Sequence, residues 1–190
     1  MTTIRLSLAA ALLVTAATAP LAAQQQQAAI DPTKVAAMAG TRGALDADLT
    51  DIETKYVKLA EAMKAKLDYR PGAGVRSAGE VFAHVAAGNL FIPTVWGVKP
   101  PAGLNAQAIS KETDPAKIVE NLKASFAHVR ASLAAVPESD LDKGVKLFGQ
   151  DATIRRAQIA IMTHMHEHLG QSIAYARASG VTPPWSGGGD

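Results

Sequence analysis

The sequence predicts an all-α protein built as a four-helix bundle. Apolar residues recur at spacings of three and four over four long segments, which is the period of amphipathic helices. Segments rich in proline and glycine separate these helices, and no segment shows the alternation that is typical of a half-buried strand. The longest connection, from about Val98 to Thr113, follows the second helix. We therefore expect a bundle with one long loop between its second and third helices.

The first helix is expected to begin at about Pro32 or at Gly43 and to end near Lys66. Gly40 and Gly43 interrupt its N-terminal part, so the stretch 32–38 is predicted to be a separate turn of helix or to be set off by a kink. The rest of this helix has a continuous apolar stripe that is expected to face the core: Leu45, Leu49, Ile52, Tyr56, Leu59 and Met63.

The second helix is expected over about 78–98, after a loop at 68–74 that is rich in proline and glycine. Ser77 precedes this helix and Glu80 follows three residues later, which is the pattern of a capping box. Pro93 predicts a kink or an end near its C-terminus, because proline has no backbone N–H to donate to the helix.

The third helix is expected to begin after Asp114, an N-cap residue, with Pro115 at the first helical position. Pro137 is expected to end it. Its inner face is apolar and contains Ile118, Leu122, Phe126, Val129 and Leu133. A second row on the same helix is polar and is predicted to face solvent: Asn121, Ser125, His128 and Ser132.

A loop at 140–150 is expected to precede the fourth helix, with Leu147 and Phe148 folded onto the bundle. The fourth helix is predicted over about 152–178. It should stop at Gly180, because glycine readily adopts the left-handed conformation that follows a helix.

The N-terminal segment has the composition of a secretory signal peptide. Arg5 gives the first residues a positive charge, an apolar run follows at 8–19, and small residues surround the expected cleavage point after Ala23. A retained membrane anchor or a buried helix is the alternative, although the run is too short to span a bilayer comfortably. We therefore expect a bacterial protein that is periplasmic or secreted.

The sequence divides into four predicted parts. We predict a signal peptide at 1–23, a flexible mature N-terminus at 24–31, a single bundle domain at 32–185 and a flexible tail at 186–190. The segment 24–31 is rich in glutamine and alanine and buries little apolar surface.

Composition excludes several classes of function. The chain has no cysteine, which rules out disulfides, cysteine-ligated zinc, thiol catalysis and lipoprotein anchoring through this chain. Its 19 basic and 17 acidic side chains nearly balance. We therefore expect no nucleic-acid partner and, after signal cleavage, no membrane partner. The oligomeric state stays open, a homodimer included.

Three of the five histidines lie close together in the fourth helix. His164 and His168 are one helical turn apart and share a face, whereas His166 points nearly the opposite way and is predicted to lie at the surface. The shared face lies within or beside the apolar stripe. Two neutral imidazoles there need partners for their ring nitrogens, and a divalent metal would satisfy both at once.

A third ligand is expected from another helix, because catalytic zinc sites commonly use three protein ligands and leave a position for water. His84, in an apolar stretch of the second helix, is the candidate; its alternative role is that of a hydrogen-bonded core histidine. Glu80, one turn earlier, could orient His84, although its capping role is favoured. Gln171 is a further candidate for the surroundings of the metal.

The segment 164–168 also matches the H-x-x-E-H pattern of some metalloproteases, in which the glutamate is the general base. That pattern needs a further acidic ligand well downstream, and Asp190 is the sole acid after His168. The protease interpretation is therefore disfavoured, and Glu167 is expected to be a solvated or inter-helix residue.

Two segments together resemble the DinB-like family of helical bundles. The segment 70–86 is similar to that family's loop and second helix, and 164–171 is similar to its H-x-x-x-H-x-G-Q signature. The resemblance implies an up-down-down-up bundle whose long second connection crosses over. It also implies a metal, usually zinc or nickel, held by the residues that match His84, His164 and His168.

Several functions fit these expectations. The first is a metal-dependent hydrolase of a small substrate, in which the metal acidifies a bound water; no catalytic side chain is identified. The resemblance also admits a thiol-dependent S-transferase, which export disfavours because small thiols are scarce outside the cytoplasm. The others are a non-enzymatic metal- or ligand-binding bundle and a bundle with buried histidines and no metal.

Overall fold

The structure is a computed structural model that describes residues 40–188. The chain divides into two units, Met1–Asp31 and Pro32–Asp190, and the fold described below belongs to the second. The predicted signal peptide at 1–23, the N-terminus at 24–31 and the helical turn at 32–38 lie outside the described residues. None of the helices within 40–188 has the length and hydropathy that a membrane span requires.

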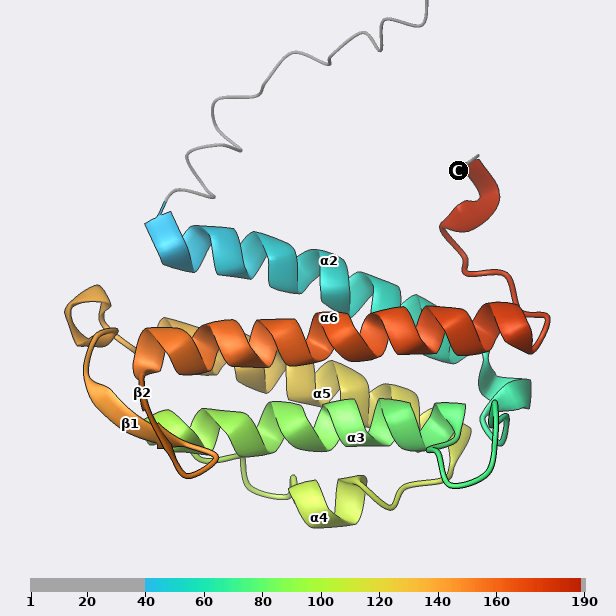
Figure 1. Cartoon of the computed structure of the whole chain (residues 1–190), viewed down its shortest axis with the longest axis horizontal. Coiled ribbons are helices and arrows are strands. Elements are labelled where there is room, and N and C mark those ends of the chain that lie inside the picture. Colours follow the sequence, from blue (N-terminus) through green and yellow to red (C-terminus); the bar gives the residue numbers. More distant parts are fainter. Residues whose placement is uncertain (1–39, 189–190) are drawn as a thin grey trace, which may run out of the picture. The chain divides into compact units, whose positions relative to one another are not determined.

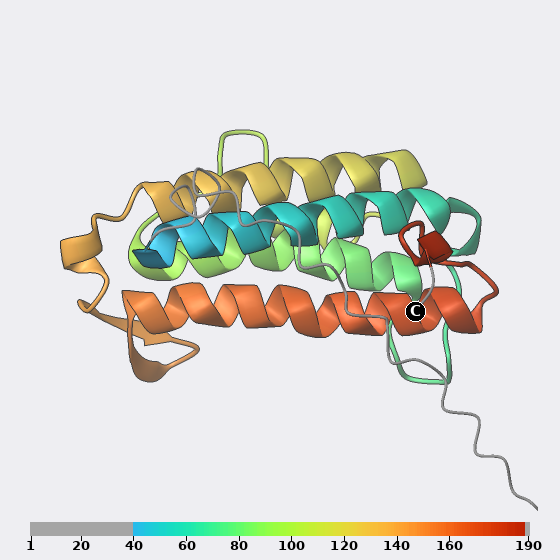
Figure 2. The ribbon, with the colours of Figure 1, turned by 90° about the horizontal axis from the view of Figure 1, so that it is seen from above.

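Four long helices form the part of the chain that the structure describes (Figure 1). They are α2 (Gly40–Ala62), α3 (Ala78–Phe91), α5 (Pro115–Ala134) and α6 (Ile154–Ala178). Helices α3 and α5 run in the same direction, opposite to α2 and α6, as both ribbon views show (Figures 1 and 2). The predicted all-α bundle with up-down-down-up topology is confirmed.

The packing of the helices makes α3 and α6 direct neighbours. Helix α3 packs against α5 and α6, and α2 packs against the same two helices, with little direct contact between α2 and α3. The stripe predicted on the first helix is the core face of α2, where Leu49, Ile52, Tyr56 and Leu59 are fully buried, and Met63 is buried just after the helix ends. The α3–α6 side of the bundle therefore carries residues from two helices that face one another.

Capping residues set the starts of the helices as predicted. The Ser77 hydroxyl accepts a hydrogen bond from the Glu80 backbone N–H at 3.2 Å, and Glu80 Oε2 accepts one from the Ser77 N–H at 2.9 Å. Asp114 caps α5. Helix α3 ends before Pro93, where a 3₁₀ turn follows and Gly97 adopts a φ of 87°. The φ of Gly180 is 81°, just beyond the end of α6.

Shorter helical turns accompany the bundle. The long crossover between α3 and α5 contains α4 (Ala106–Ile109), which the sequence analysis did not predict and which lies alongside α3. Asn105 caps it, and Ile109 anchors it in the core. The 3₁₀ turns are Lys64–Lys66, Ile92–Trp96, Glu138–Asp140 and Ser186–Gly188.

A β-hairpin corrects the prediction that the chain has no strands. Strand β1 (Gly144–Leu147) pairs antiparallel with β2 (Gln150–Thr153). Phe148 and Gly149 form the connection with φ values of 49° and 84°, the doubly left-handed geometry that two-residue hairpins favour. Leu147 is buried as expected, but Phe148 is 67 % exposed. The prediction for Phe148 is wrong because the turn points its side chain away from the core.

Three of the four residues of the polar row on α5 are buried, which corrects their predicted solvent exposure, and the fourth, Asn121, is partly buried. Ser125 and Ser132 are fully buried and His128 is 5 % exposed. Asn89 of α3 donates a hydrogen bond to the Ser125 hydroxyl at 3.2 Å, and the Trp96 indole donates to the Ser132 carbonyl at 3.4 Å. This part of the row faces α3 and the 3₁₀ turn that follows it, where Asn89 and Trp96 supply polar partners for buried groups.

Candidate metal centre

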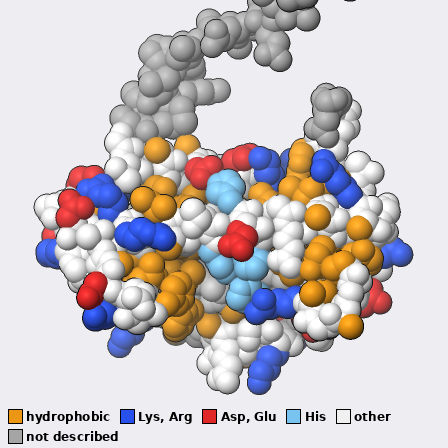
Figure 3. All heavy atoms as spheres, in the orientation of Figure 1, with side chains coloured by type: hydrophobic (Ala, Val, Ile, Leu, Met, Phe, Trp, Pro, Cys, Tyr) orange, Lys and Arg blue, Asp and Glu red, His pale blue; other side chains and the backbone are white. Residues whose placement is uncertain are grey.

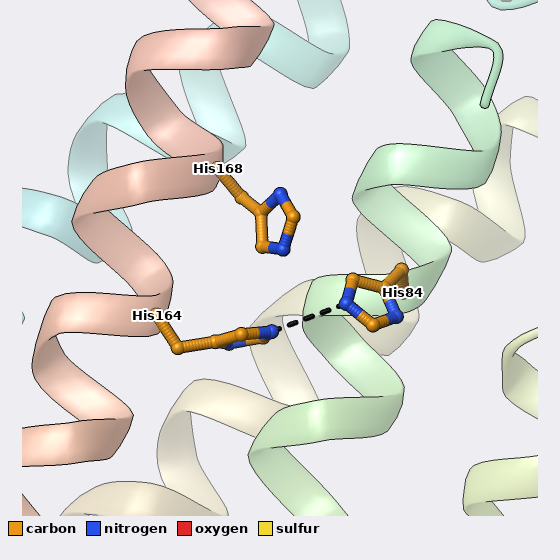
Figure 4. A group of neighbouring side chains, drawn as sticks. All are labelled: His84, His164 and His168. Carbon is orange, nitrogen blue, oxygen red and sulfur yellow. Dashed lines mark hydrogen bonds between the residues drawn. The ribbon is translucent and has the colours of Figure 1, made fainter. Parts of the chain in front are cut away.

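Three histidines from two neighbouring helices meet on one side of the bundle. His84 comes from α3, and His164 and His168 come from α6 (Figure 4). Each offers a ring nitrogen, and these three atoms all lie within 4.8 Å of one another. The Nε2 atoms of His84 and His164 are 3.2 Å apart, and the ring centroids of the three pairs are 4.7 to 5.1 Å apart.

This arrangement fits a divalent metal. Zinc–nitrogen bonds are about 2.0–2.1 Å long, so two ligand nitrogens of a tetrahedral site lie roughly 3.3 Å apart. The separation of the His84 and His164 nitrogens is already close to that value. An all-imidazole set suits zinc, nickel and copper better than magnesium or calcium, which prefer oxygen. The three histidines could therefore hold a divalent transition metal.

The electrostatics of the group favour the ligand form of the rings. Burial lowers the pKa of His84 to about 4, with further lowering from the charges of Arg76 and His168. Burial lowers the pKa of His164 to about 4 as well, and the nearby His168, His84 and Arg76 add to the effect. Both rings are thus neutral at pH 7, and a neutral ring keeps the lone pair that binds a metal.

A chain of hydrogen bonds orients His168. Its Nδ1 lies 2.8 Å from Gln171 Oε1, and the Gln171 amide donates to the Tyr175 hydroxyl at 2.9 Å. Since an amide oxygen only accepts, Nδ1 carries the proton and Nε2 is left free as a ligand. A partner of this kind on the far ring nitrogen is typical of metal-binding histidines. Gln171 therefore has a supporting role in the site.

Gly88 makes room for His164, and the sequence analysis missed it. A Cβ atom at Gly88 would lie 2.8 Å from His164 Cε1, closer than such atoms approach. His164 Nδ1 is buried and has no hydrogen-bond partner among the described residues. The available signal was a glycine one turn after His84 in a helix interior, where glycine costs about 1 kcal/mol relative to alanine and usually has a packing reason.

Helix α6 is fixed from behind by α2. The buried Tyr56 hydroxyl donates a hydrogen bond to the backbone carbonyl of Met165 at 2.7 Å, between the two histidines of the site. His166 lies on the other side of α6, where its Nε2 is 3.0 Å from a carboxylate oxygen of Asp48 and its side chain is exposed. As predicted, His166 is apart from the group, and Glu167 is exposed.

Glu80 serves the helix start rather than the histidines. Its carboxylate accepts two hydrogen bonds from Arg70, at 2.6 and 2.8 Å, besides its capping bond from Ser77. The Arg70 hydrogen bond is the largest cause that lowers the pKa of Glu80, followed by the Ser77 N–H. Its favoured capping role is confirmed.

The histidine group reaches the surface. His84, His164 and His168 are each partly buried, and the space-filling view shows histidine side chains exposed in the middle of the face that α3 and α6 form (Figure 3). Beside His84 the surface is hollowed, with a volume of about 460 Å³. A metal held here would be open to a small molecule from solvent.

The fold and this group define an all-α bundle with a candidate metal centre. The sequence model of the DinB superfamily matches residues 35–172, and the chain belongs to that superfamily. Its fold is similar to that of a DinB-like protein from Bacillus cereus, with 18 % identity and a TM-score of 0.66 over 76 % of this chain and 95 % of that one. A DinB-like protein from Bacillus subtilis has 23 % identity and a TM-score of 0.59, over 73 % and 94 % of the two chains. No curated protein is similar enough to count as a match.

Proposed function

We propose that this protein is a metal-dependent hydrolase of a small substrate, with zinc or nickel held by His84, His164 and His168. One observation carries the proposal: two neutral imidazoles and a third, oriented one converge at a solvent-facing hollow. A buried structural site would need no such access.

The residues of the site have separate roles. His84, His164 and His168 supply three ligands, which leaves coordination positions for water and substrate. A bound metal would supply Lewis-acid chemistry, polarising a substrate carbonyl or phosphoryl group and lowering the pKa of water. Gln171 and Tyr175 hold the His168 ring in its binding tautomer. Gly88 allows α3 to approach α6 closely enough for both helices to contribute.

Metal analysis of protein purified without an affinity tag tests the site. We expect close to one zinc or nickel per chain in the wild type, and loss of that metal in the His84→Ala variant. His166→Ala is the matched control, since it removes an imidazole from the same helix but from the side that faces Asp48, without touching the group. Full metal retention by His84→Ala would contradict a site built from both helices.

Activity is tested separately with metal-loaded protein. A panel of small esters, amides and phosphate esters should contain a substrate that is hydrolysed by the wild type and not by the His84→Ala variant. Transfer of a thiol to the substrate in place of water would show an S-transferase instead. Stoichiometric metal with no turnover on any of these substrates would favour a metal-binding protein without enzymatic function.

We also propose that the protein acts outside the cytoplasm. The support is the sequence pattern of Arg5, the apolar run at 8–19 and the small residues near Ala23. Mass spectrometry of protein recovered from a periplasmic extract should give a mature chain that begins at Gln24. A full-length chain that stays in the cytoplasmic fraction would contradict export.

A further inference from the structure

The hollow beside the histidine group has the charge and size to select a substrate. We propose that it binds a small molecule that carries a carboxylate or phosphate group, with Arg76 and Lys111 holding this anion while the reacting group lies at His84. This inference rests on the proposed function and adds a substrate class to it.

The hollow is continuous with the candidate metal centre. Its lining on the α3 side includes Arg76, Glu80 and His84, and on the opposite side it is formed by the segment 110–113 between α4 and α5. His84 belongs both to this lining and to the histidine group. The volume of about 460 Å³ falls in the range of small-molecule sites, which is roughly 300–1,000 Å³. A ligand in the hollow would therefore reach the metal.

Two cations of the lining are uncommitted. Arg76 and Lys111 are exposed, and neither forms a hydrogen bond or an ion pair with its side chain within residues 40–188. The charge of Arg76 nevertheless reaches the site, because it contributes to the lowered pKa values of His84 and His164. Figure 3 shows Lys or Arg side chains directly beside the exposed histidines.

The two acids of the lining are already engaged. Both carboxylate oxygens of Glu80 accept hydrogen bonds from Arg70, so an opposite charge compensates this residue. Glu112 Oε1 accepts hydrogen bonds from the backbone N–H groups of Thr113 and Asp114, each at 2.9 Å. Because Arg70 neutralises Glu80, the lining keeps the two positive charges of Arg76 and Lys111 against the single negative charge of Glu112.

The donors that remain suit an anion with several oxygens. A guanidinium presents paired N–H groups that match a carboxylate or a phosphate, and an ammonium adds a point charge. The Thr113 hydroxyl, which forms no side-chain hydrogen bond within the described residues, is a further donor in the same lining. A cationic or wholly apolar ligand would leave these groups uncompensated.

Anion binding is measured by isothermal titration calorimetry with succinate and with inorganic phosphate. The full chain is titrated both as purified and after chelation, because an anion can also bind directly to a metal. We expect Arg76→Gln and Lys111→Gln each to weaken anion binding about 10-fold in both forms. A loss of this size corresponds to the removal of one charge-assisted hydrogen bond. Arg76→Lys, which keeps the charge, should weaken it less.

Lys123→Gln is the matched control, because it removes the same charge from an exposed position on α5 outside the lining. Succinamide, the neutral analogue, should bind at least 10-fold more weakly than succinate. A preference for succinate over phosphate, or the reverse, then separates carboxylate from phosphate substrates. Circular dichroism of each variant checks that the bundle is intact.

Equal anion affinity in the wild type and in the Arg76→Gln/Lys111→Gln double variant would overturn the inference. So would equal affinity for succinate and succinamide. These outcomes leave the metal analysis and the hydrolysis assay untouched, so they are distinct from a failure of the proposed function. Conversely, the wild type could bind anions but hydrolyse no substrate, while the double variant loses anion binding. That result would refute the hydrolase and support the anion site.

Discussion

Helix α3 takes part in two polar clusters that differ in what they can bind. On its α6 side lies the histidine group, in which three rings converge and reach solvent. On its α5 side lies the polar seam, which we define as Asn89, Ser125, His128 and Ser132, all buried. Both clusters contain a buried ring nitrogen without a hydrogen-bond partner among the described residues, one on His164 and one on His128.

The two clusters differ in how many ring nitrogens converge and in whether solvent reaches them. His128 is the one histidine of the seam, and its neighbours are hydroxyl and amide groups that already bond to one another or to backbone. Burial lowers its pKa, as it does for His84 and His164. A lowered pKa therefore does not identify a ligand by itself; the approach of further donors from a second helix does.

The largest expected effect separates the two clusters directly. His164→Ala removes a ligand of the histidine group and should weaken zinc binding at least about 100-fold, because two imidazoles form a much weaker site. His128→Ala should leave zinc affinity unchanged but lower the free energy of unfolding by about 2 kcal/mol, since it opens a cavity in the core. Chelator competition and urea denaturation measure the two quantities. Loss of zinc in the His128→Ala variant would erase the distinction.

The next effect concerns the support of the histidine group. Gln171→Leu removes the acceptor of the His168 Nδ1–H, and we expect a loss of about 10- to 100-fold in zinc affinity. Tyr175→Phe removes only the outer hydroxyl of that chain and should cost less. Chelator competition ranks the two variants. Equal effects would show that the tautomer of His168 is not set through Gln171.

Gly88→Ala should weaken zinc binding about 10-fold while the fold persists. The added methyl group meets the end of the His164 ring, which can rotate away only by leaving its position in the group. Gly170→Ala is the control on α6, where an added Cβ meets nothing within 4 Å. It should keep zinc affinity and raise the free energy of unfolding by about 0.5–1 kcal/mol. Unchanged affinity in Gly88→Ala would contradict the role of the close approach.

The last prediction concerns the pH dependence of the stability of the metal-free protein. The folded-state pKa values of His84 and His164, about 4, lie below the ordinary value of 6.5. The unfolded chain therefore binds more protons in this window, and stability decreases as pH falls from 6.5 towards 4. Urea denaturation at pH 7 and 4.5 should show a smaller loss in a His84→Gln/His164→Gln variant than in the wild type. Equal losses would mean that these rings are not held neutral.

Local signals predicted the helices well, and tertiary contacts account for the errors. Ser77, Asp114 and Pro93 act within their own helices, so their effects could be predicted without knowledge of the fold. The burial of Ser125 and His128 results from the packing of α3 against α5, which a polar row on one helix does not reveal. The hairpin was missed because two four-residue strands give almost no periodic signal.

The same division between local signals and tertiary contacts applies to the candidate site. Helical spacing distinguishes His164 and His168 from His166, because all three lie on one helix. The choice of His84 needed a composition argument and the family resemblance, since spacing within α6 says nothing about α3. Gly88 could be recognised only once the distance between the two helices was known.

The crossover between α3 and α5 has a consequence for how such a protein diversifies. Because α3 and α5 are parallel, the chain must return along the bundle between them, and on the way it passes the hollow beside His84. Ser110, Lys111 and Thr113 are exposed there and hold no part of the core. Substitutions in this segment can change what reaches the histidines at little cost in stability, so ligand preference can diverge in the crossover while the histidine group on the rigid helices stays the same.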